Sequence, residues 1–229
     1  MLAVTQPQAW RLGAMWFGIQ VVWTSVLGVV LQDRVTVLDP ANAVAIYAAI
    51  AAGGAALASI VQIAAGILSD RLRARSGHRL LFYRCGVAIA VPALIALVLA
   101  PSVAWVWATV AVLQVGMNLA GGPYQAIVGD YIAADRVGRA SSWMSVFQFS
   151  GSVVGLLLTI ALHGAALGVA LAACLVAGWW VTHAYARTLP GSRGAAPALR
   201  LDANAWTVIA SRALINVGFY TLFGFLYFF

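Results

Sequence analysis

The chain has 229 residues, of which 63% are hydrophobic and only 8% charged, and its formal net charge is +7. So little polar surface excludes an ordinary water-soluble globular protein and makes lipid the expected solvent. All thirteen cationic residues are arginine, and the absence of lysine excludes phosphate-loop and Schiff-base lysine chemistry. We therefore expect a membrane protein that is not an enzyme.

Seven apolar stretches are long enough to cross a bilayer as helices, because about 20 residues span its hydrocarbon core of about 30 Å. In chain order they are 12–31, 44–68, 80–100, 103–128, 140–162, 165–186 and 206–229. The prediction is an all-α integral membrane protein with a six-helix bundle over residues 1–187. A polar segment with several Gly and Pro residues, 188–205, is predicted to be a cytoplasmic linker. The seventh helix, 206–229, ends without a polar flank, as a truncated helix would.

The arginines alternate between the two sides of the expected membrane. Twelve of the thirteen lie on one side, and Arg34 alone lies on the other. Because cytoplasmic loops carry an excess of basic residues, the N-terminus is expected in the cytoplasm and the protein in the plasma (inner) membrane. The positive charge then reflects orientation and contact with anionic lipid, and no nucleic-acid partner is expected. No cleavable signal peptide is expected, because the first stretch is too long.

The expected spans hold no carboxylate near their centres, and amides take that place. The polar or aromatic residues at depth are Gln20, Trp23, Thr24, Gln62, Gln114, Asn118, Gln148 and Asn216. Buried amides are unfavourable in lipid unless they are hydrogen-bonded, so these side chains line a shared wet cavity or join helix to helix. Trp23 could stack on a sugar ring or simply pack in the bundle.

The few cysteine and histidine residues predict no disulfide and no metal site. Cys85 and Cys174 fall in different apolar stretches and at different depths. His78, His163 and His183 are dispersed along the chain without the spacing of metal ligands. No cofactor is expected.

Two segments carry a family resemblance. Residues 66–71 read GILSDR, and residues 75–79, after three further residues, read RSGHR. The pattern resembles the loop between the second and third helices of the major facilitator superfamily, in the longer form found in sucrose-type and glycoside-pentoside-hexuronide cation symporters. Gly66 is expected to allow a close helix contact and Asp70 to make a gating contact, whereas Arg73 and Arg84 are expected only to set topology.

The second segment follows the fourth stretch. Residues 122–130 read GPYQAIVGD and residues 136–141 read RVGRAS, similar to the fourth helix and the following loop of the same family. The resemblance covers most of residues 12–160 and implies the N-terminal half of the fold, built from 3+3 inverted repeats. By this resemblance the gating residues are Gly66, Asp70, Arg71, Arg75, Gly77, Arg79, Asp130, Arg136 and Arg139.

The resemblance implies a secondary transporter for a small polar solute, a sugar or glycoside, with a coupling cation and a complementary C-terminal six-helix half as partners. The implied solute contacts are Gln20, Trp23, Gln114, Asn118 and Gln125. Two positions depart from the sucrose symporters, because Gln114 stands where they carry an aspartate and Gln125 where they carry an arginine. Glutamine does not exchange a proton, which argues against proton coupling at Gln114. The alternative is a non-transporting membrane scaffold or assembly factor on the same half-fold.

Overall fold

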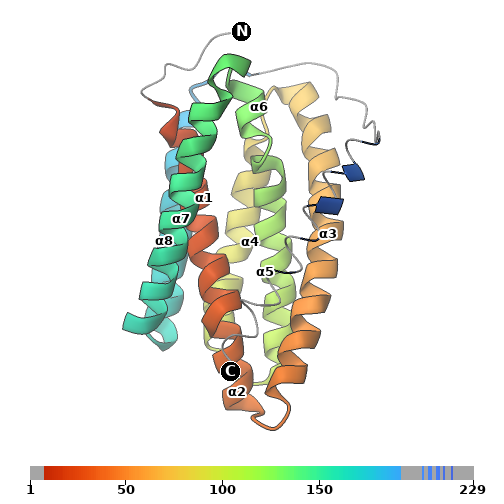
Figure 1. The fold of residues 1–229 in the computed structure, drawn as a ribbon, viewed down its shortest axis with the longest axis vertical. Coiled ribbons are helices and arrows are strands. Elements are labelled where there is room, and N and C mark those ends of the chain that lie inside the picture. The colour runs from red at the N-terminus through yellow and green to blue at the C-terminus, as the bar shows by residue number, and fades with distance from the viewer. Residues whose placement is uncertain are drawn as a thin grey trace.

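The computed structural model describes residues 8–191 and, beyond them, only Ala203, Trp206, Thr207, Ala210, Ser211, Leu214 and Gly218. Every regular element in residues 8–191 is a helix (Figure 1). The elements are α1 (Trp10–Ser25), η2 (Val26–Val30), α2 (Leu31–Leu38), α3 (Ala43–Ser76), α4 (Leu80–Val98), α5 (Val103–Tyr124), α6 (Ile127–Tyr131), η3 (Ala134–Arg136), α7 (Val137–Ala161) and α8 (Gly164–Ala186). Most of the expected linker and of the seventh helix lies outside the described residues.

Six of the expected spans are present as helices long and apolar enough to cross a membrane. They are Trp10–Leu38, Ala43–Ser76, Leu80–Val98, Val103–Tyr131, Val137–Ala161 and Gly164–Ala186. The first two continue further than the apolar pattern predicted, to Leu38 and to Ser76. Hydropathy marks only the part of a helix that lies in lipid, so it does not detect a helix that continues into a polar environment.

The first span contains a widened turn. Its segment η2 is a π-helix, in which the Leu31 N–H donates to the Val26 carbonyl five residues earlier. The neighbouring Leu27 carbonyl accepts hydrogen bonds from side chains. The Gln32 amide donates to it, and the Tyr47 hydroxyl donates to it at 3.3 Å. Gln32 is fully buried, so this polar side chain is part of the core of the bundle.

Arg34 has a structural reason to lie apart from the other arginines. Its guanidinium donates to the carbonyl of Ala100, in the turn that follows α4. A cation at the C-terminal end of a helix is favourable, because the last carbonyls there lack partners and carry partial negative charge. The contact joins α2 to the turn between α4 and α5 and accounts for the helical extension to Leu38.

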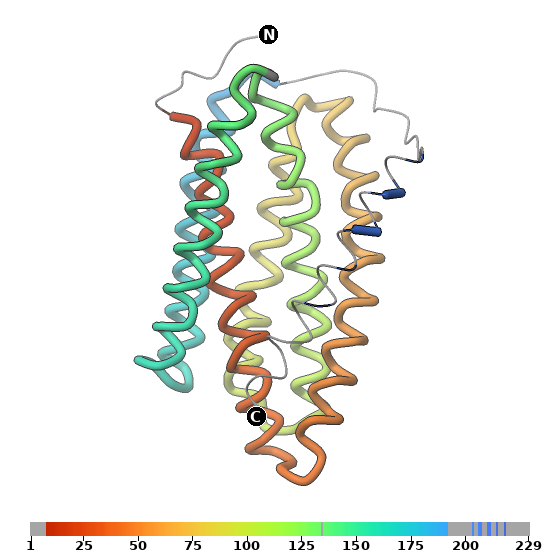
Figure 2. Tube along the Cα trace, viewed as in Figure 1, coloured from red at the N-terminus to blue at the C-terminus, as the bar shows by residue number. Residues whose placement is uncertain are grey.

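The packing of the helices follows a two-fold internal pattern (Figure 2). The first unit holds the span of α1 to α2, then α3 and α4; the second holds α5 with α6, then α7 and α8. Helix α1 packs on α7 and α8, and its counterpart α5 packs on α3 and α4, while α4 and α8 pack on each other. Exchanging the two units therefore maps the contacts of α1 onto those of α5 and the α4–α8 contact onto itself, as expected for 3+3 repeats.

Glycines mark the closest helix contacts. A Cβ atom on Gly86 of α4 would lie 2.5 Å from the backbone N of Ala120 on α5. A Cβ on Gly151 or Gly155 of α7 would lie 2.5 Å or 2.7 Å from carbonyl oxygens of α1. Small residues allow such approaches between helices in lipid.

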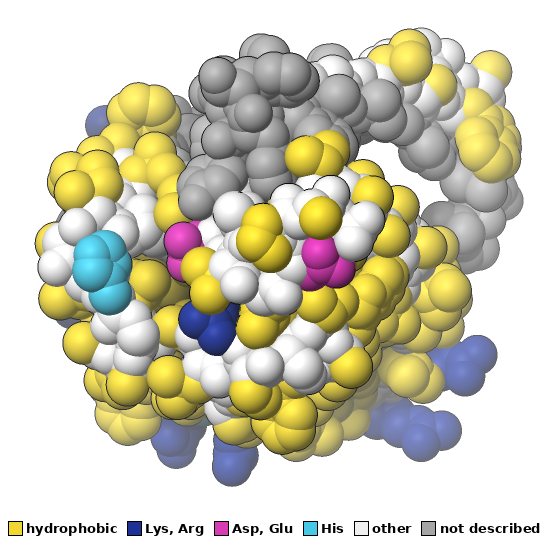
Figure 3. Space-filling view, turned by 90° about the horizontal axis from the view of Figure 1, so that it is seen from below, with side chains coloured by type: hydrophobic (Ala, Val, Ile, Leu, Met, Phe, Trp, Pro, Cys, Tyr) yellow, Lys and Arg dark blue, Asp and Glu magenta, His cyan; other side chains and the backbone are white. Residues whose placement is uncertain are grey.

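The outer surface is apolar. Large hydrophobic side chains are exposed on several helices, among them Ile60 and Ile63 of α3, Phe149 and Ile160 of α7, and Trp180 of α8. Seen from the end opposite the α3–α4 turn, hydrophobic side chains dominate the described surface and charged ones are few (Figure 3). The exposed hydrophobic side chains along α3, α7 and α8 suit a lipid environment.

Candidate functional site

The turn between α3 and α4 folds a basic segment back onto the end of α3. Gly77 follows the last residue of α3 with φ of 85°, a left-handed conformation that favours glycine, and its N–H donates to the Arg73 carbonyl at 2.7 Å. The His78 N–H donates to the Ser76 hydroxyl at 3.3 Å. The reversal places Arg79, just before α4, beside the last turns of α3.

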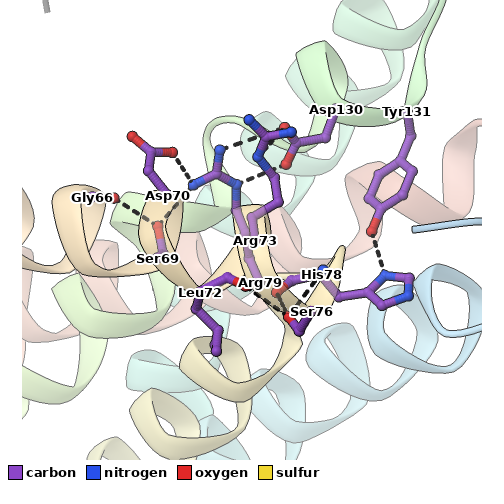
Figure 4. Close-up of polar contacts among 10 residues, drawn as sticks. All are labelled: Gly66, Ser69, Asp70, Leu72, Arg73, Ser76, His78, Arg79, Asp130 and Tyr131. Atoms are coloured by element: carbon purple, nitrogen blue, oxygen red, sulfur yellow. Dashed lines mark hydrogen bonds and ion pairs between the residues drawn. The ribbon is translucent and has the colours of Figure 1, made fainter. Parts of the chain in front are cut away.

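Arg79 is the centre of a charged cluster that also contains Ser69, Asp70, Arg73 and Asp130 (Figure 4). Its Nη1 lies 2.5 Å from Asp70 Oδ1 and donates to Ser69 Oγ at 2.8 Å, and its Nε donates to Asp130 Oδ2 at 2.7 Å. The Arg79 side chain is only 6% exposed. One guanidinium therefore joins α3, the start of α4 and α6.

Arg73 is the second cation of the cluster. Its Nε lies 3.6 Å from Asp130 Oδ1, and its side chain is 12% exposed. The expectation that Arg73 only sets topology is therefore wrong. Helical spacing explains its position, because Ser69 and Arg73 are four residues apart and share a face of α3. Two cations and two carboxylates balance in charge, which allows the group to be buried.

The electrostatic environment keeps Arg79 protonated. Burial alone would lower the pKa of its guanidinium, but the hydrogen bonds and charges of Asp130 and Asp70 outweigh burial and raise that pKa above its ordinary value. The cluster does not open by loss of this proton at physiological pH.

A separate polar contact joins the same turn to α6. His78 Nδ1 lies 3.1 Å from the hydroxyl of Tyr131, which follows Asp130 in the sequence. The α3–α4 turn is therefore held to α6 by the Arg79–Asp130 ion pair and by the His78–Tyr131 contact. Sequence reasoning missed Ser69 and Tyr131, although each is the direct neighbour of an aspartate that it did select.

The other predicted gating residues lie outside the charged cluster. Arg71 and Arg75 are exposed and pair with no described residue, because they lie on the face of α3 opposite Ser69 and Arg73. Arg136 lies 3.6 Å from its neighbour Asp135, and Arg139 is exposed on the first turn of α7.

Within the described part of the chain, Gly66 makes no close helix contact of the kind expected. A Cβ atom there would meet no described atom within 4 Å. The residue lies on an open part of the α3 surface, and its carbonyl accepts the Ser69 hydroxyl at 2.9 Å.

The predicted solute contacts occupy three places in the bundle. Gln114 is 7% exposed, lies against Gly54 of α3, and accepts a hydrogen bond from the Asn118 amide at 2.9 Å. Gln20 of α1 donates to Ser152 of α7 at 3.3 Å. Both glutamines lie about ten residues into the first helix of their units, and the helices that they face, α7 and α3, are equivalent in the two-fold pattern.

Trp23 and Gln125 lie apart from these amides. Trp23 is half-buried and packs against the apolar core. Gln125 is exposed in the short turn between α5 and α6, about 16 Å along the helix from Gln114. The structure thus brings Gln114 and Asn118 together and places Gln125 nearer the charged cluster.

Comparison with known proteins agrees with this architecture. The family model described as Major Facilitator Superfamily matches residues 2–156 and residues 45–229. The chain belongs to the major facilitator superfamily. No curated protein matches the chain at a significant level.

Membership in the major facilitator superfamily gives the arrangement its general meaning. The six apolar helices and their paired packing form a half of the superfamily's fold in an integral membrane protein. Members of the superfamily are transporters rather than enzymes, and they move small solutes across the lipid bilayer.

Proposed function

We propose that this chain forms the N-terminal half of a secondary active transporter that moves a small polar solute, a sugar or glycoside, by alternating access. The observation that carries the proposal is the buried charged cluster centred on Arg79. It makes one end of the bundle a rigid unit, as a gate that moves as a body requires.

In this proposal the charged cluster supports the gate, and Asp70 is the residue that contacts the opposing half. Asp130 is 11% exposed and is enclosed by Arg73 and Arg79, whereas Asp70 is 33% exposed. Asp70 can therefore accept a further hydrogen bond, for example from a helix N-terminus of the partner half. The proposal assigns Gly66, Gly77, Arg71, Arg75, Arg136 and Arg139 to the same gate.

The solute path is proposed along α1, α5 and α7, at Gln20, Trp23, Gln114, Asn118 and Gln125. Support comes from α7, where Ser141, Ser145 and Gln148 are exposed and follow one another at helical spacing toward Ser152. A polar stripe at membrane depth is unfavourable against lipid, so it favours a wet cavity. Amides and hydroxyls suit a solute rich in hydroxyl groups.

A complementary six-helix half is proposed to close this cavity. The described residues place no carboxylate beside Gln114, so a coupling cation would be bound elsewhere, for example by the complementary half. The cation and the identity of the solute are parts of the proposal that uptake assays address.

The orientation has a direct test. The proposal places the protein in the plasma (inner) membrane with its N-terminus in the cytoplasm. A cysteine replacing Ser76 should then react with an impermeant thiol reagent only from the cytoplasmic side, and a cysteine replacing Ala41 should react only from outside. The reverse pattern would contradict the orientation.

One observation favours the alternative, a non-transporting membrane scaffold. The Asn118 amide already donates to the main-chain and side-chain oxygens of Gln114 in its own helix, as an amide with a purely structural role would. Radiolabelled sugar uptake by cells that express the chain with a complementary half distinguishes the two functions. Uptake that Gln20→Ala and Gln114→Ala abolish supports transport, whereas stable assembly without uptake of any sugar or glycoside supports the scaffold.

A further inference from the structure

A second polar site lies where α4 and α8 pack together. We define the α4–α8 seam by Arg84 of α4, by Trp179 and His183 of α8, and by Arg187, which follows α8. None of these side chains takes part in the charged cluster around Arg79.

Two nitrogens of the seam are buried without a hydrogen-bond partner among the described residues. They are Trp179 Nε1 and His183 Nδ1. The two rings are in contact, with centroids 5.0 Å apart, and His183 is only 7% exposed. Buried polar atoms in proteins are nearly always hydrogen-bonded, so two neighbouring exceptions indicate that a partner is missing.

The chemistry of the seam specifies what that partner is. An indole N–H and a guanidinium can only donate hydrogen bonds, so the partner must be an acceptor. Arg84 and Arg187 are both exposed; Arg187 follows His183 by one helical turn, and Arg84 lies on α4, which packs on α8. Neither arginine pairs with an acid in the described part of the chain. The missing group is therefore an acceptor with negative charge.

The surroundings of the seam distinguish a lipid from a free anion. Trp180, the neighbour of Trp179, is 60% exposed, and Leu81 of α4 is 52% exposed. Exposed tryptophan next to arginine at the end of a membrane helix is typical of the level of the lipid headgroups. A phosphate held there would have its acyl chains against the apolar surface of α4 and α8.

We propose that the α4–α8 seam binds the phosphodiester of an anionic phospholipid. The phosphate oxygens accept from Trp179, from the His183 ring, and from the guanidiniums of Arg84 and Arg187. This site is independent of the solute path and of the proposed transport.

The experiment measures lipid retention by the purified full chain in detergent, using native mass spectrometry. Phosphatidylglycerol is titrated against phosphatidylcholine, and inorganic phosphate forms a third arm. We expect the parent chain to retain phosphatidylglycerol in preference to phosphatidylcholine and to bind inorganic phosphate at most weakly. Inorganic phosphate that competes as well as the lipid would overturn the lipid assignment.

Matched variants distinguish lipid binding at the seam from general attraction of anionic lipid to the positive charge of the chain. Arg84→Gln with Arg187→Gln should lower retention of phosphatidylglycerol by about ten-fold or more, because two charged hydrogen bonds are lost. Arg71→Gln with Arg75→Gln removes the same charge from exposed positions of α3 and should change retention less than about two-fold. Equal losses in the two double variants would overturn the proposal.

A second pair tests the buried donor. Trp179→Phe keeps an aromatic ring, although a smaller one, and removes the N–H, so retention should fall by about three- to ten-fold. Trp180→Phe is the control and should have no effect. Because Arg84 and Arg187 are exposed, their substitution should leave the fold intact. If Trp179→Phe fails to fold, the Arg84→Gln, Arg187→Gln variant therefore still tests the lipid site. Unchanged retention in a folded Trp179→Phe variant would also contradict the site.

Discussion

The charged cluster around Arg79 and the amides Gln20 and Gln114 are both polar and at least partly buried, but they are held differently. Arg79 contacts two carboxylates and a hydroxyl from two helices, α3 and α6, within 2.5–2.8 Å. Gln20 makes one contact with α7 at 3.3 Å, and Gln114 bonds mainly to Asn118 in its own helix. The cluster fixes the relative positions of helices, whereas the amides can exchange partners with little loss. A gate suits the first arrangement, and a solute site suits the second.

The largest effect that this comparison predicts comes from Arg79→Gln. The variant leaves Asp70 and Asp130 without their main partner, and breaking a buried ion pair typically costs about 3–5 kcal/mol. We expect a correspondingly lower free energy of unfolding, measured by denaturation of the purified chain in detergent. Arg71→Gln removes an exposed arginine from the same region and should change stability by less than about 0.5 kcal/mol. Equal effects of the two substitutions would mean that the contacts of Arg79 contribute no more to stability than those of an exposed arginine.

The two aspartates should differ from each other. Asp130→Asn leaves Arg73 and Arg79 facing each other in a buried site and should destabilise the chain by about 1.5–3 kcal/mol. Asp70 is more exposed, so Asp70→Asn should have a smaller effect, below about 1.5 kcal/mol, because solvent screens the pair. The same unfolding assay tests the order, and a larger loss for Asp70→Asn would show that the cluster is organised around Asp70 instead.

Much of the fold could be predicted from the sequence, because the apolar stretches of the first six spans are long and well separated. The ends at Leu38 and Ser76 could not, since Arg34 and the left-handed Gly77 set them through contacts outside the apolar pattern. Among the site residues, the pairing of Asp70 and Asp130 through one arginine depends on the turn that returns Arg79 to α3. Helical periodicity along 69–75 could have separated Arg73 from Arg71 and Arg75.

The environment of Gln114 was not predictable, because sequence does not show which helix a buried amide will face. Gly54 now offers a fine test, since a Cβ there would lie 3.0 Å from Gln114 Nε2. Alanine in place of glycine within a helix normally stabilises by about 0.5–1 kcal/mol. Gly66→Ala, with open space around it, should show that gain in the unfolding assay. Gly54→Ala should not show that gain in stability and should reduce sugar uptake. Equal stability of the two variants would mean that the Gln114 side chain moves away from the new methyl group without a loss of free energy.

The most direct test of a gate supported by the charged cluster is the accessibility of the α7 stripe in the assembled transporter. In a background with Cys85→Ser and Cys174→Ser, a cysteine replacing Gln148 is labelled from the side of the α3–α4 turn by an impermeant thiol reagent, and a cysteine replacing the exposed Val176 of α8 serves as control. We expect Asp70→Asn to raise the rate of labelling at position 148 by about ten-fold, as the loss of one charge-assisted contact allows, and to leave position 176 unchanged. Equal labelling of position 148 with and without Asp70→Asn would contradict the account.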